Sequence, residues 1–365
     1  MTNFSRYHNP VEVHFGTGTL DHLPALVGNR QAVLVTMPEA RALGMTARVE
    51  ALCGASLAGI VDEVSPNPDV RELAPMYEDF WRRHADCEVI VALGGGSALD
   101  TAKLLMVAGD TPDFAPLAET LAAGQTFVPA RRKCLITIPT TAGTGSEVTP
   151  WATLWDRHVN RRKYSLHLPE TWPDAAIVDP ALTRSLPASI TLQSGLDALS
   201  HALEAVWNVN ANPISDTFAV AAARSMLDVL PRLMADLDNP ALREQAALAA
   251  LQAGMAFSNT KTALAHSISY DVTIRHGIPH GIACSFTLPA VLRMATGRRP
   301  DRDAVLAQIF DGDVARAPHT LTAFLNGLGV ATEFSAYGMA EAESSALIAS
   351  ALEGPRGRNF IGAAA

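Results

Sequence analysis

The sequence predicts an α/β domain with a parallel sheet, followed by an all-α domain, and two patterns support this. Before about residue 185, short apolar strands such as residues 32–36 and 135–138 alternate with helical stretches, which indicates a parallel sheet covered on both faces. Beyond that point, residues 215–237 and 241–257 are rich in alanine and leucine at helical spacing and show no strand pattern. We therefore expect an α/β domain followed by an all-α domain, with one boundary between them.

The length of the chain indicates how these patterns divide. With 365 residues it exceeds what one small core organises, so two domains are expected. We predict an α/β domain over residues 1–185 and a helical domain over residues 186–365, with a hinge near Leu186 and Pro187. No internal repeat, low-complexity tract or long linker interrupts either part.

Charge and composition argue against several classes of partner and location. The formal net charge is −9, and the one basic cluster, at residues 161–163, is short, which argues against nucleic acid. The start of the chain has no apolar signal core, and no stretch offers the roughly twenty apolar residues that would cross a membrane. The cysteines form no C-x-x-C pair and no ligand pattern, so reduced thiols in a cytoplasmic protein are expected. These cysteines are Cys53, Cys87, Cys134 and Cys284.

Two strand-to-loop passages in the first half have features of a phosphate site. A buried strand runs into GGGSALDTAK, residues 94–103, where glycines let backbone N–H groups approach a pyrophosphate and a helix start adds partial positive charge. Another strand runs into PTTAGTGSE, residues 139–147, whose hydroxyls can donate to phosphate, ribose or a carboxamide. Either loop alone could be an ordinary turn, but two in one domain indicate a nucleotide site.

Four residues in the second half have spacings that fit a divalent metal site. Asp197 and His201 stand four apart in GLDALSHALE, residues 195–204, so a helix would project both from one face. His266 follows an apolar helical stretch, and His280 lies in a tight Gly-Ile-Pro-His-Gly passage. Three imidazoles and one carboxylate suit Fe²⁺, Zn²⁺, Ni²⁺ or Co²⁺, and the sequence does not choose among them.

These motifs together resemble the iron-containing (group III) alcohol dehydrogenases. The resemblance runs in order from FGTG at residues 15–18 to about residue 280. It includes both loops above, the Asp179-Pro180 pair, GLDALSHALE, His266 and the PHG at residues 279–281. It implies an N-terminal nucleotide-binding domain, a C-terminal helical domain, a metal and NAD(P)-linked interconversion of an alcohol with an aldehyde or ketone.

Carried over by position, the resemblance assigns both cofactors. The metal, with Fe²⁺ expected first and Zn²⁺ or Ni²⁺ as alternatives, is held by Asp197, His201, His266 and His280. The NAD(P) contacts are Gly95, Gly96, Ser97, Asp100, Thr140, Thr141, Thr144 and Lys163. The expected chemistry is Lewis-acid polarisation of the substrate oxygen, with hydride passing between the substrate carbon and C4 of the nicotinamide.

The chain departs from the family at the position expected to serve proton transfer. Many members carry a histidine four residues after the third ligand, where this sequence has Tyr270. A phenol donates a hydrogen bond but is a poor base near pH 7, because its reference pKa is about 10. Tyr270, His276, water or ribose hydroxyls could relay the proton, and Tyr270 could equally be a wall of the pocket.

A second departure concerns the choice of coenzyme. Members that prefer NAD tend to place an aspartate just after the second strand, where it repels a 2′-phosphate, and this sequence has Met37 there. We predict that NADPH is accepted, alongside NADH or alone. Glu39 could take the place of the aspartate if its loop curls back.

The substrate is indicated by the basic segment at residues 155–167. Its cationic side chains, among them Arg161 and Arg162, could bind an anionic group, although they could also form a solvated turn. With the segment around His266 they resemble the subgroup that reduces phosphonoacetaldehyde to 2-hydroxyethylphosphonate.

Other activities remain open at this point. A lyase resembling dehydroquinate synthase shares the two-domain plan, the metal and the dinucleotide but returns its coenzyme unchanged. A reductase resembling maleylacetate reductase is a second alternative, and a binding protein without turnover is a third. A homodimer is expected from the family.

Overall fold

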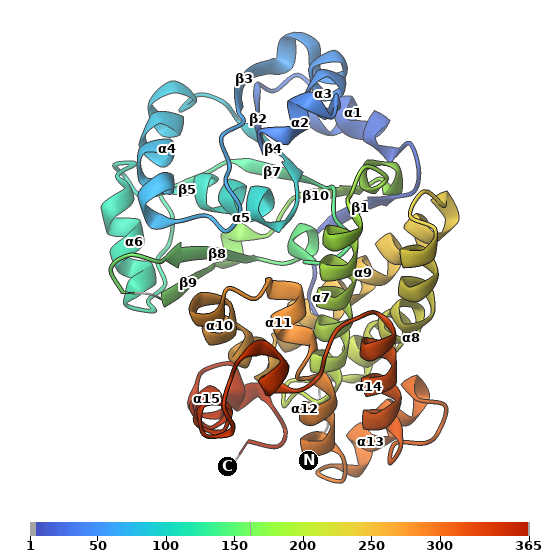
Figure 1. Cartoon of the computed structure of the whole chain (residues 1–365). Coiled ribbons are helices and arrows are strands. Elements are labelled where there is room, and N and C mark those ends of the chain that lie inside the picture. The colour runs from blue at the N-terminus through green and yellow to red at the C-terminus, as the bar shows by residue number, and fades with distance from the viewer. Residues whose placement is uncertain (1–4, 161, 364–365) are drawn as a thin grey trace. The chain divides into compact units, whose positions relative to one another are not determined.

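The computed structural model describes residues 5–160 and 162–363, and the chain divides into two compact units. Pro10–Thr141 with Ser146–Ser185 form one, here named the sheet unit. Met1–Asn9, Ala142–Gly145 and Leu186–Ala365 form the other, here named the helical unit. The expected fold class is confirmed, because the first unit contains a parallel sheet and the second is built from helices (Figure 1). The expected limits of 1–185 and 186–365 stay a prediction.

The main sheet has six strands in the order β1-β10-β7-β4-β2-β3, and every neighbouring pair is parallel. The strand expected at residues 32–36 is β2, and the one at residues 135–138 lies inside β7. The strands are β1 Glu12–Phe15, β2 Ala32–Thr36, β3 Leu57–Val61, β4 Val89–Gly94, β7 Cys134–Pro139 and β10 Ala175–Val178.

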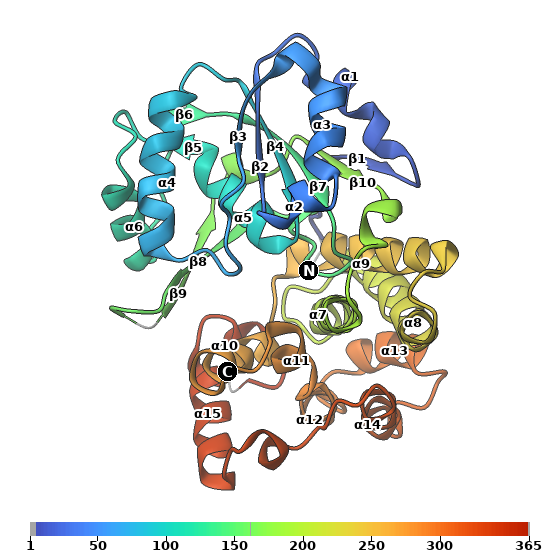
Figure 2. The ribbon, with the colours of Figure 1, turned by 45° about the horizontal axis from the view of Figure 1, so that its top comes forward.

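Side chains that alternate along the central strands explain why helices cover both faces. Val33 and Val35 pack with helices α4 to α6 in one core, whereas Leu34 packs with α1 and α3 in another. Figure 2 shows these two helix groups on opposite sides of the strands. A strand buried on both faces must be apolar throughout, which is the pattern read from the sequence. The helices are α1 Leu23–Val27, α2 Glu39–Ala42, α3 Met45–Cys53, α4 Val70–Arg83, α5 Gly96–Leu105 and α6 Phe114–Ala122.

Two small antiparallel pairs complete the sheet unit. The hairpin of β8 (Trp151–Asp156) and β9 (Arg162–His167) packs Leu154 and Leu166 into the same core as α4 to α6. The other pair is β5 (Val107–Ala108) with β6 (Arg131–Arg132).

The helical unit has one core, and α7 runs through it. The helices expected at residues 215–237 and 241–257 form α8 and α9. Their first backbone N–H groups are capped by the side chains of Asn212 and Asn239, each followed by a proline at the first helical position. The helices are α7 Ala188–Val206, α8 Pro213–Ala235, α9 Pro240–Thr260, α10 Leu264–His276, α11 His280–Ser285, α12 Leu288–Ala295, α13 Pro300–Ile309, α14 Ala317–Gly327 and α15 Glu341–Glu353.

The segment after α15 is docked rather than loose. Phe360 is buried, and the Ile361 backbone N–H donates to the Trp207 carbonyl at 3.2 Å. The Val209 N–H donates to the Asn359 carbonyl at 2.7 Å. These contacts fix the chain just before Phe360, where Arg356 lies.

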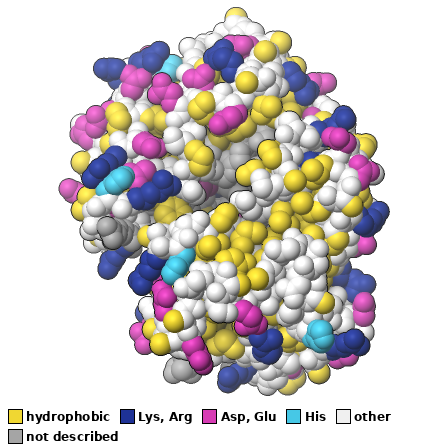
Figure 3. Space-filling model, in the orientation of Figure 1, with side chains coloured by type: hydrophobic (Ala, Val, Ile, Leu, Met, Phe, Trp, Pro, Cys, Tyr) yellow, Lys and Arg dark blue, Asp and Glu magenta, His cyan; other side chains and the backbone are white. Residues whose placement is uncertain are grey.

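The surface carries charges of both signs. On the face shown in Figure 3, acidic and basic side chains are interspersed and no extended basic block is visible. Among the described residues, no helix combines the length and apolar character needed to span a membrane.

Candidate metal and coenzyme sites

Three expected histidines surround one carboxylate oxygen of Asp197 in the helical unit. Oδ1 of Asp197 lies 3.4 Å from Nε2 of His266, 3.8 Å from Nε2 of His280 and 3.9 Å from Nε2 of His201. Two donors on a tetrahedral cation stand about 3.4 Å apart when each bond is about 2.1 Å. The structure therefore brings these side chains to separations close to those of ligands on one cation.

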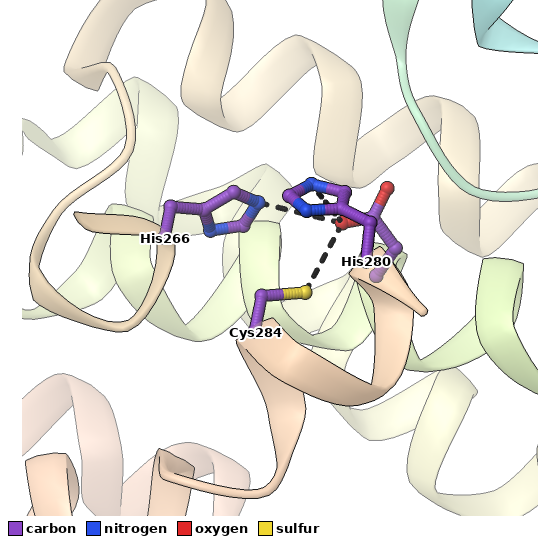
Figure 4. A group of neighbouring side chains, drawn as sticks. His266, His280 and Cys284 are labelled. Carbon is purple, nitrogen blue, oxygen red and sulfur yellow. Dashed lines mark hydrogen bonds and ion pairs between the residues drawn. The ribbon is translucent and has the colours of Figure 1, made fainter. Parts of the chain in front are cut away.

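One group of four neighbouring donors differs in one member from the expected set. One donor atom each from Asp197, His266, His280 and Cys284 lies within 4.8 Å of the other three. Figure 4 shows the two imidazoles and the thiol pointing toward one another. His201 is not a member of this group, although its Nε2 lies 3.9 Å from Oδ1 of Asp197. Its ring stacks on Phe257 and on His266, with 4.1 and 4.5 Å between ring centroids. No motif in the sequence points to Cys284, although it stands four residues after His280.

Glu204 fixes the orientation of His266 and was also missed by the sequence reasoning. Its carboxylate accepts hydrogen bonds from Nδ1 of His266 at 2.6 Å and from the backbone N–H groups of Ala263 and Ala265. It is fully buried and follows Asp197 by seven residues on the same face of α7. A carboxylate behind a histidine in this way holds the other ring nitrogen toward a metal. The seven-residue spacing from Asp197 was the feature of the sequence that could have pointed to Glu204.

The electrostatics of the group fit a cation. Burial alone would raise the pKa of Asp197, but His201, His266 and His280 together lower it well below its usual range. Burial lowers the pKa of His201 to about 4, so its ring is neutral near pH 7 with a lone pair available. Nε2 of His266 is buried and makes no hydrogen bond of good geometry, although Oδ1 of Asp197 lies 3.4 Å away. A buried ring nitrogen without a good partner is costly unless something else occupies it. A divalent cation would satisfy that nitrogen and the carboxylate together.

A glycine explains how His280 reaches the group. His280 is the first residue of α11, and a Cβ on the next residue, Gly281, would lie 2.0 Å from the carbonyl oxygen of Gln193 in α7. Only glycine lets α11 approach α7 this closely. The PHG motif therefore sets the distance from His280 to Asp197.

Of the two residues expected to relay a proton, only Tyr270 lies beside a metal-site residue. Its ring is parallel to that of His280, with centroids 6.3 Å apart, and the Arg356 guanidinium lies 4.8 Å from its centroid. Burial raises the pKa of Tyr270 to about 12, so the phenol keeps its proton near pH 7. His276 stands ten residues beyond His266 on α10, about 15 Å along the axis, and its Nε2 contacts Glu343 at 3.0 Å. The structure does not bring His276 to the group.

The expected phosphate loop lies at the carboxyl edge of the sheet. Gly94 pairs with Pro139 at the ends of β4 and β7, so the GGGS loop and Thr140 follow neighbouring strands. Gly94 has φ of +151°, and a Cβ there would lie 2.7 Å from that of Ala98, so the turn requires glycine. In this sheet β2 is followed along the chain by β3, at one edge, whereas β4 is followed by β7, on the other side. The strand order therefore reverses between β2 and β4, and ligands of doubly wound sheets bind at such a point.

The coenzyme residues expected in this loop have different surroundings. Gly95 and Gly96 lead into α5, and a Cβ on Gly95 would lie 3.3 Å from the Thr141 methyl group. The Ser97 hydroxyl accepts a hydrogen bond from the Asn67 N–H at 2.9 Å. These glycines and Ser97 lie beside the start of α5, where a phosphate can bind.

Asp100 and Lys103 form a buried network inside the sheet unit. The two Asp100 carboxylate oxygens accept from Ser146 Oγ at 2.7 Å and from the Thr153 N–H at 2.8 Å. Lys103, fully buried, donates to the Ser146 carbonyl at 2.6 Å and to the Trp151 carbonyl at 2.8 Å. The network ties α5 to β8 and to Ser146 ahead of it. The coenzyme role of Asp100 stays a prediction, and the observed bonds are structural.

The PTTAGTGSE loop is split between the units. Thr140 and Thr141 belong to the sheet unit, whereas Thr144 belongs to the helical unit. The glycines beside Thr144 permit close packing, since a Cβ on Gly143 would lie 2.7 Å from Ser194 and one on Gly145 would lie 2.6 Å from Gly254. The loop glycines thus allow close packing against α7 and α9.

The expected residues on the β8–β9 hairpin are only partly described. Lys163 lies 5.4 Å from the ring centroid of Trp155, and Arg162 is exposed on β9. Arg161 lies outside the described residues. A coenzyme role for Lys163 and a substrate role for Arg162 stay predictions.

Two family profiles cover most of the chain. The one described as "Iron-containing alcohol dehydrogenase" matches residues 10–180, and "Fe-containing alcohol dehydrogenase family, C-terminal" matches residues 191–361. These profiles include both loops and the residues around Asp197.

Individual proteins are similar over different lengths. Probable alcohol dehydrogenase EutG of Escherichia coli (strain K12) is 37% identical over 62% of this chain and 60% of its own length. Phosphonoacetaldehyde reductase of Streptomyces viridochromogenes is 37% identical over 56% of this chain and 53% of its own length. The matched region therefore spans little more than half of either protein.

A solved structure is similar over nearly the whole chain. Sulfoacetaldehyde reductase from Bifidobacterium kashiwanohense, in complex with NAD⁺, has a TM-score of 0.89 and 31% identity. The similarity covers 98% of this chain and 94% of that one. The similarity extends to both units.

Proposed function

This chain belongs to the iron-containing alcohol dehydrogenase family, as its motifs predicted, and we propose that it is a metal-dependent oxidoreductase. It transfers a hydride between NAD(P)H and a small aldehyde or primary alcohol. The observation that carries the proposal is that donor atoms of Asp197, His266 and His280 lie within 4.8 Å of one another, with Asp197 and His266 buried and His280 half-buried. A carboxylate and two imidazoles are ligands suited to a divalent cation, and Nε2 of one imidazole, that of His266, lacks a hydrogen-bond partner. A core that served packing alone would not require a buried nitrogen in this state.

Each cofactor supplies part of the chemistry that side chains lack. A bound cation provides Lewis acidity toward a carbonyl oxygen, and NAD(P)H provides the hydride. The chain holds Asp197 ionised and His201 neutral, so both are in the state that binds a cation. Tyr270 keeps its phenol protonated and serves as a hydrogen-bond donor beside His280.

The proposed substrate is a small aldehyde with an anionic group, with phosphonoacetaldehyde as the first candidate. Two similar proteins are named as reductases of phosphonoacetaldehyde and sulfoacetaldehyde. In this chain, Arg356 lies over Tyr270, which in turn is stacked beside His280. A guanidinium binds a phosphonate or sulfonate through paired hydrogen bonds. Arg356 therefore supports an anionic substrate from within the helical unit, which the sequence reasoning had assigned to Arg161 and Arg162.

We expect the metal-loaded protein to oxidise NAD(P)H with phosphonoacetaldehyde and, less efficiently, with a neutral aldehyde such as propanal. Arg356→Gln should raise KM for phosphonoacetaldehyde about ten- to hundredfold, because a charge-assisted hydrogen bond contributes about 1.5–3 kcal/mol. Efficiency with propanal should stay within about twofold of wild type. Initial rates of coenzyme oxidation measure both.

Matched variants make the assay decisive. Arg275→Gln removes an exposed arginine from α10 and should change neither substrate. If Arg162→Gln weakens phosphonoacetaldehyde binding and Arg356→Gln does not, the assignment to Arg356 is wrong.

Indifference of wild type to the anionic group would refute this substrate class. Conversion without net coenzyme oxidation would instead favour the lyase, and a preference for maleylacetate would favour the reductase of that compound.

The proposed coenzyme preference includes NADPH. Met37 follows β2 and is half-buried, with its sulfur 3.0 Å from where a Cβ on Gly94 would lie. Met37→Asp places a carboxylate beside the phosphate loop and should lower kcat/KM for NADPH relative to NADH by at least about tenfold, through repulsion of the 2′-phosphate. Glu39 is exposed at the start of α2, so Glu39→Gln serves as the comparison. A strong NADH preference in wild type would contradict the proposal.

The expected homodimer and cytoplasmic location stay predictions. Sedimentation of the purified protein would test the first of them.

A further inference from the structure

Cys284 faces the metal group but has no part in the function proposed above. It is fully buried on α11, four residues after His280, so both side chains leave the same side of that short helix. Its Sγ lies 3.4 Å from Oδ1 of Asp197. The thiol therefore approaches the same carboxylate oxygen as the histidines.

A second observation points to a ligand at this place. Nε2 of His266 is buried without a hydrogen-bond partner, and Glu204 holds the opposite side of the ring. That nitrogen and the Cys284 sulfur each lie 3.4 Å from Oδ1 of Asp197. Donors on a tetrahedral cation with metal–nitrogen bonds of about 2.0–2.1 Å and metal–sulfur bonds of about 2.3 Å stand roughly 3.3–3.6 Å apart. The sulfur thus has the separation of a ligand.

We propose that the Cys284 thiolate is a further ligand of the cation, together with Asp197, His266 and His280. The inference rests on the proposed function only in that a cation binds there. Coordination forms one metal–sulfur bond, and the thiol proton leaves to solvent. A thiolate is a softer donor than carboxylate or imidazole, so the centre holds Zn²⁺ and Co²⁺ more tightly than nitrogen and oxygen donors alone would.

The test is the absorption spectrum of protein stripped of metal and loaded with one Co²⁺ per chain. Thiolate coordination gives an intense near-ultraviolet charge-transfer band, which oxygen and nitrogen donors do not give. Wild type should show the band, and Cys284→Ser should bind cobalt without it. The control is Cys134→Ser, a half-buried cysteine of β7 in the sheet unit, which should keep it. Zn²⁺ affinity should fall at least about tenfold in Cys284→Ser, since even second-shell changes typically cost that much.

X-ray absorption at the zinc edge of wild type needs no variant, and it decides the question if Cys284→Ser does not fold. One sulfur at about 2.3 Å supports the inference. Stoichiometric metal with no sulfur neighbour and no charge-transfer band overturns it. Neither readout uses coenzyme or aldehyde. If the thiolate charge-transfer band is present but turnover is absent, the inference holds and the proposed function is wrong. If turnover is present but the band is absent, the proposed function holds and the inference is wrong.

Discussion

Asp197→Ala is expected to lose bound metal and catalysis together, with kcat/KM falling at least about a thousandfold, because Lewis-acid stabilisation contributes several kcal/mol. Asp197 is the only carboxylate in the close donor group, and its Oδ1 lies within 3.9 Å of Nε2 in His201, His266 and His280. Its removal leaves imidazoles with no negative charge between them. Elemental analysis and coenzyme oxidation on the same preparation measure both effects.

Two further variants separate metal loss from misfolding. Asp197→Asn has the same shape and removes only the charge, so it should keep the fold and still lose most of the metal. Asp228→Ala removes an exposed carboxylate of α8 that pairs with Arg232, a contact worth little, and should retain metal and activity. Full activity in metal-depleted Asp197→Asn would contradict the account.

Glu204→Ala is expected to lower both stability and metal affinity. The carboxylate accepts from the N–H groups of Ala263 and Ala265 and from the His266 ring, and all of these donors would be left buried. An unsatisfied buried group costs about 1–3 kcal/mol, so the free energy of unfolding should fall by roughly 3–5 kcal/mol. Metal affinity should fall about ten- to hundredfold, as when the second shell of a metal site is changed. Denaturant unfolding and metal competition measure these effects.

The control for this variant also removes a carboxylate from beside a histidine. Glu343→Gln loses the contact with His276 on a less buried part of the same unit and should change neither stability nor metal affinity appreciably. Glu204→Gln keeps one acceptor oxygen and should fall between Glu204→Ala and wild type. A change in the unfolding free energy of Glu204→Ala below about 0.5 kcal/mol would show that the carboxylate does not hold α10 in place.

Local patterns in the sequence were sufficient where neighbours along the chain determine the structure. The strand at residues 32–36 is apolar on both faces, and the Asp197 and His201 spacing fixes two side chains on one helix face, so both were predicted. The helices α8 and α9 followed from their composition and helical spacing. The order of the strands in the sheet could not be read from residue spacing.

Features that depend on contacts distant in sequence were missed for that reason. Nothing local indicates that Cys284 reaches Asp197, 87 residues away. The spacing of Glu204 from Asp197 places both on one face of α7, but it does not show that Glu204 supports the start of α10. Gly143 and Gly145 lie in a loop that was interpreted through its hydroxyls, yet these glycines permit packing on α7 and α9. No motif in the sequence singles out Arg356, and only the docked C-terminal segment places it over Tyr270.

The most direct test is a titration of metal-free protein with Fe²⁺ under anaerobic conditions, with NADPH oxidation by an aldehyde as the readout. Activity should be absent at the start, rise in proportion to added iron and reach a plateau at one equivalent per chain. Undiminished turnover in protein shown by elemental analysis to hold no metal would contradict the central claim.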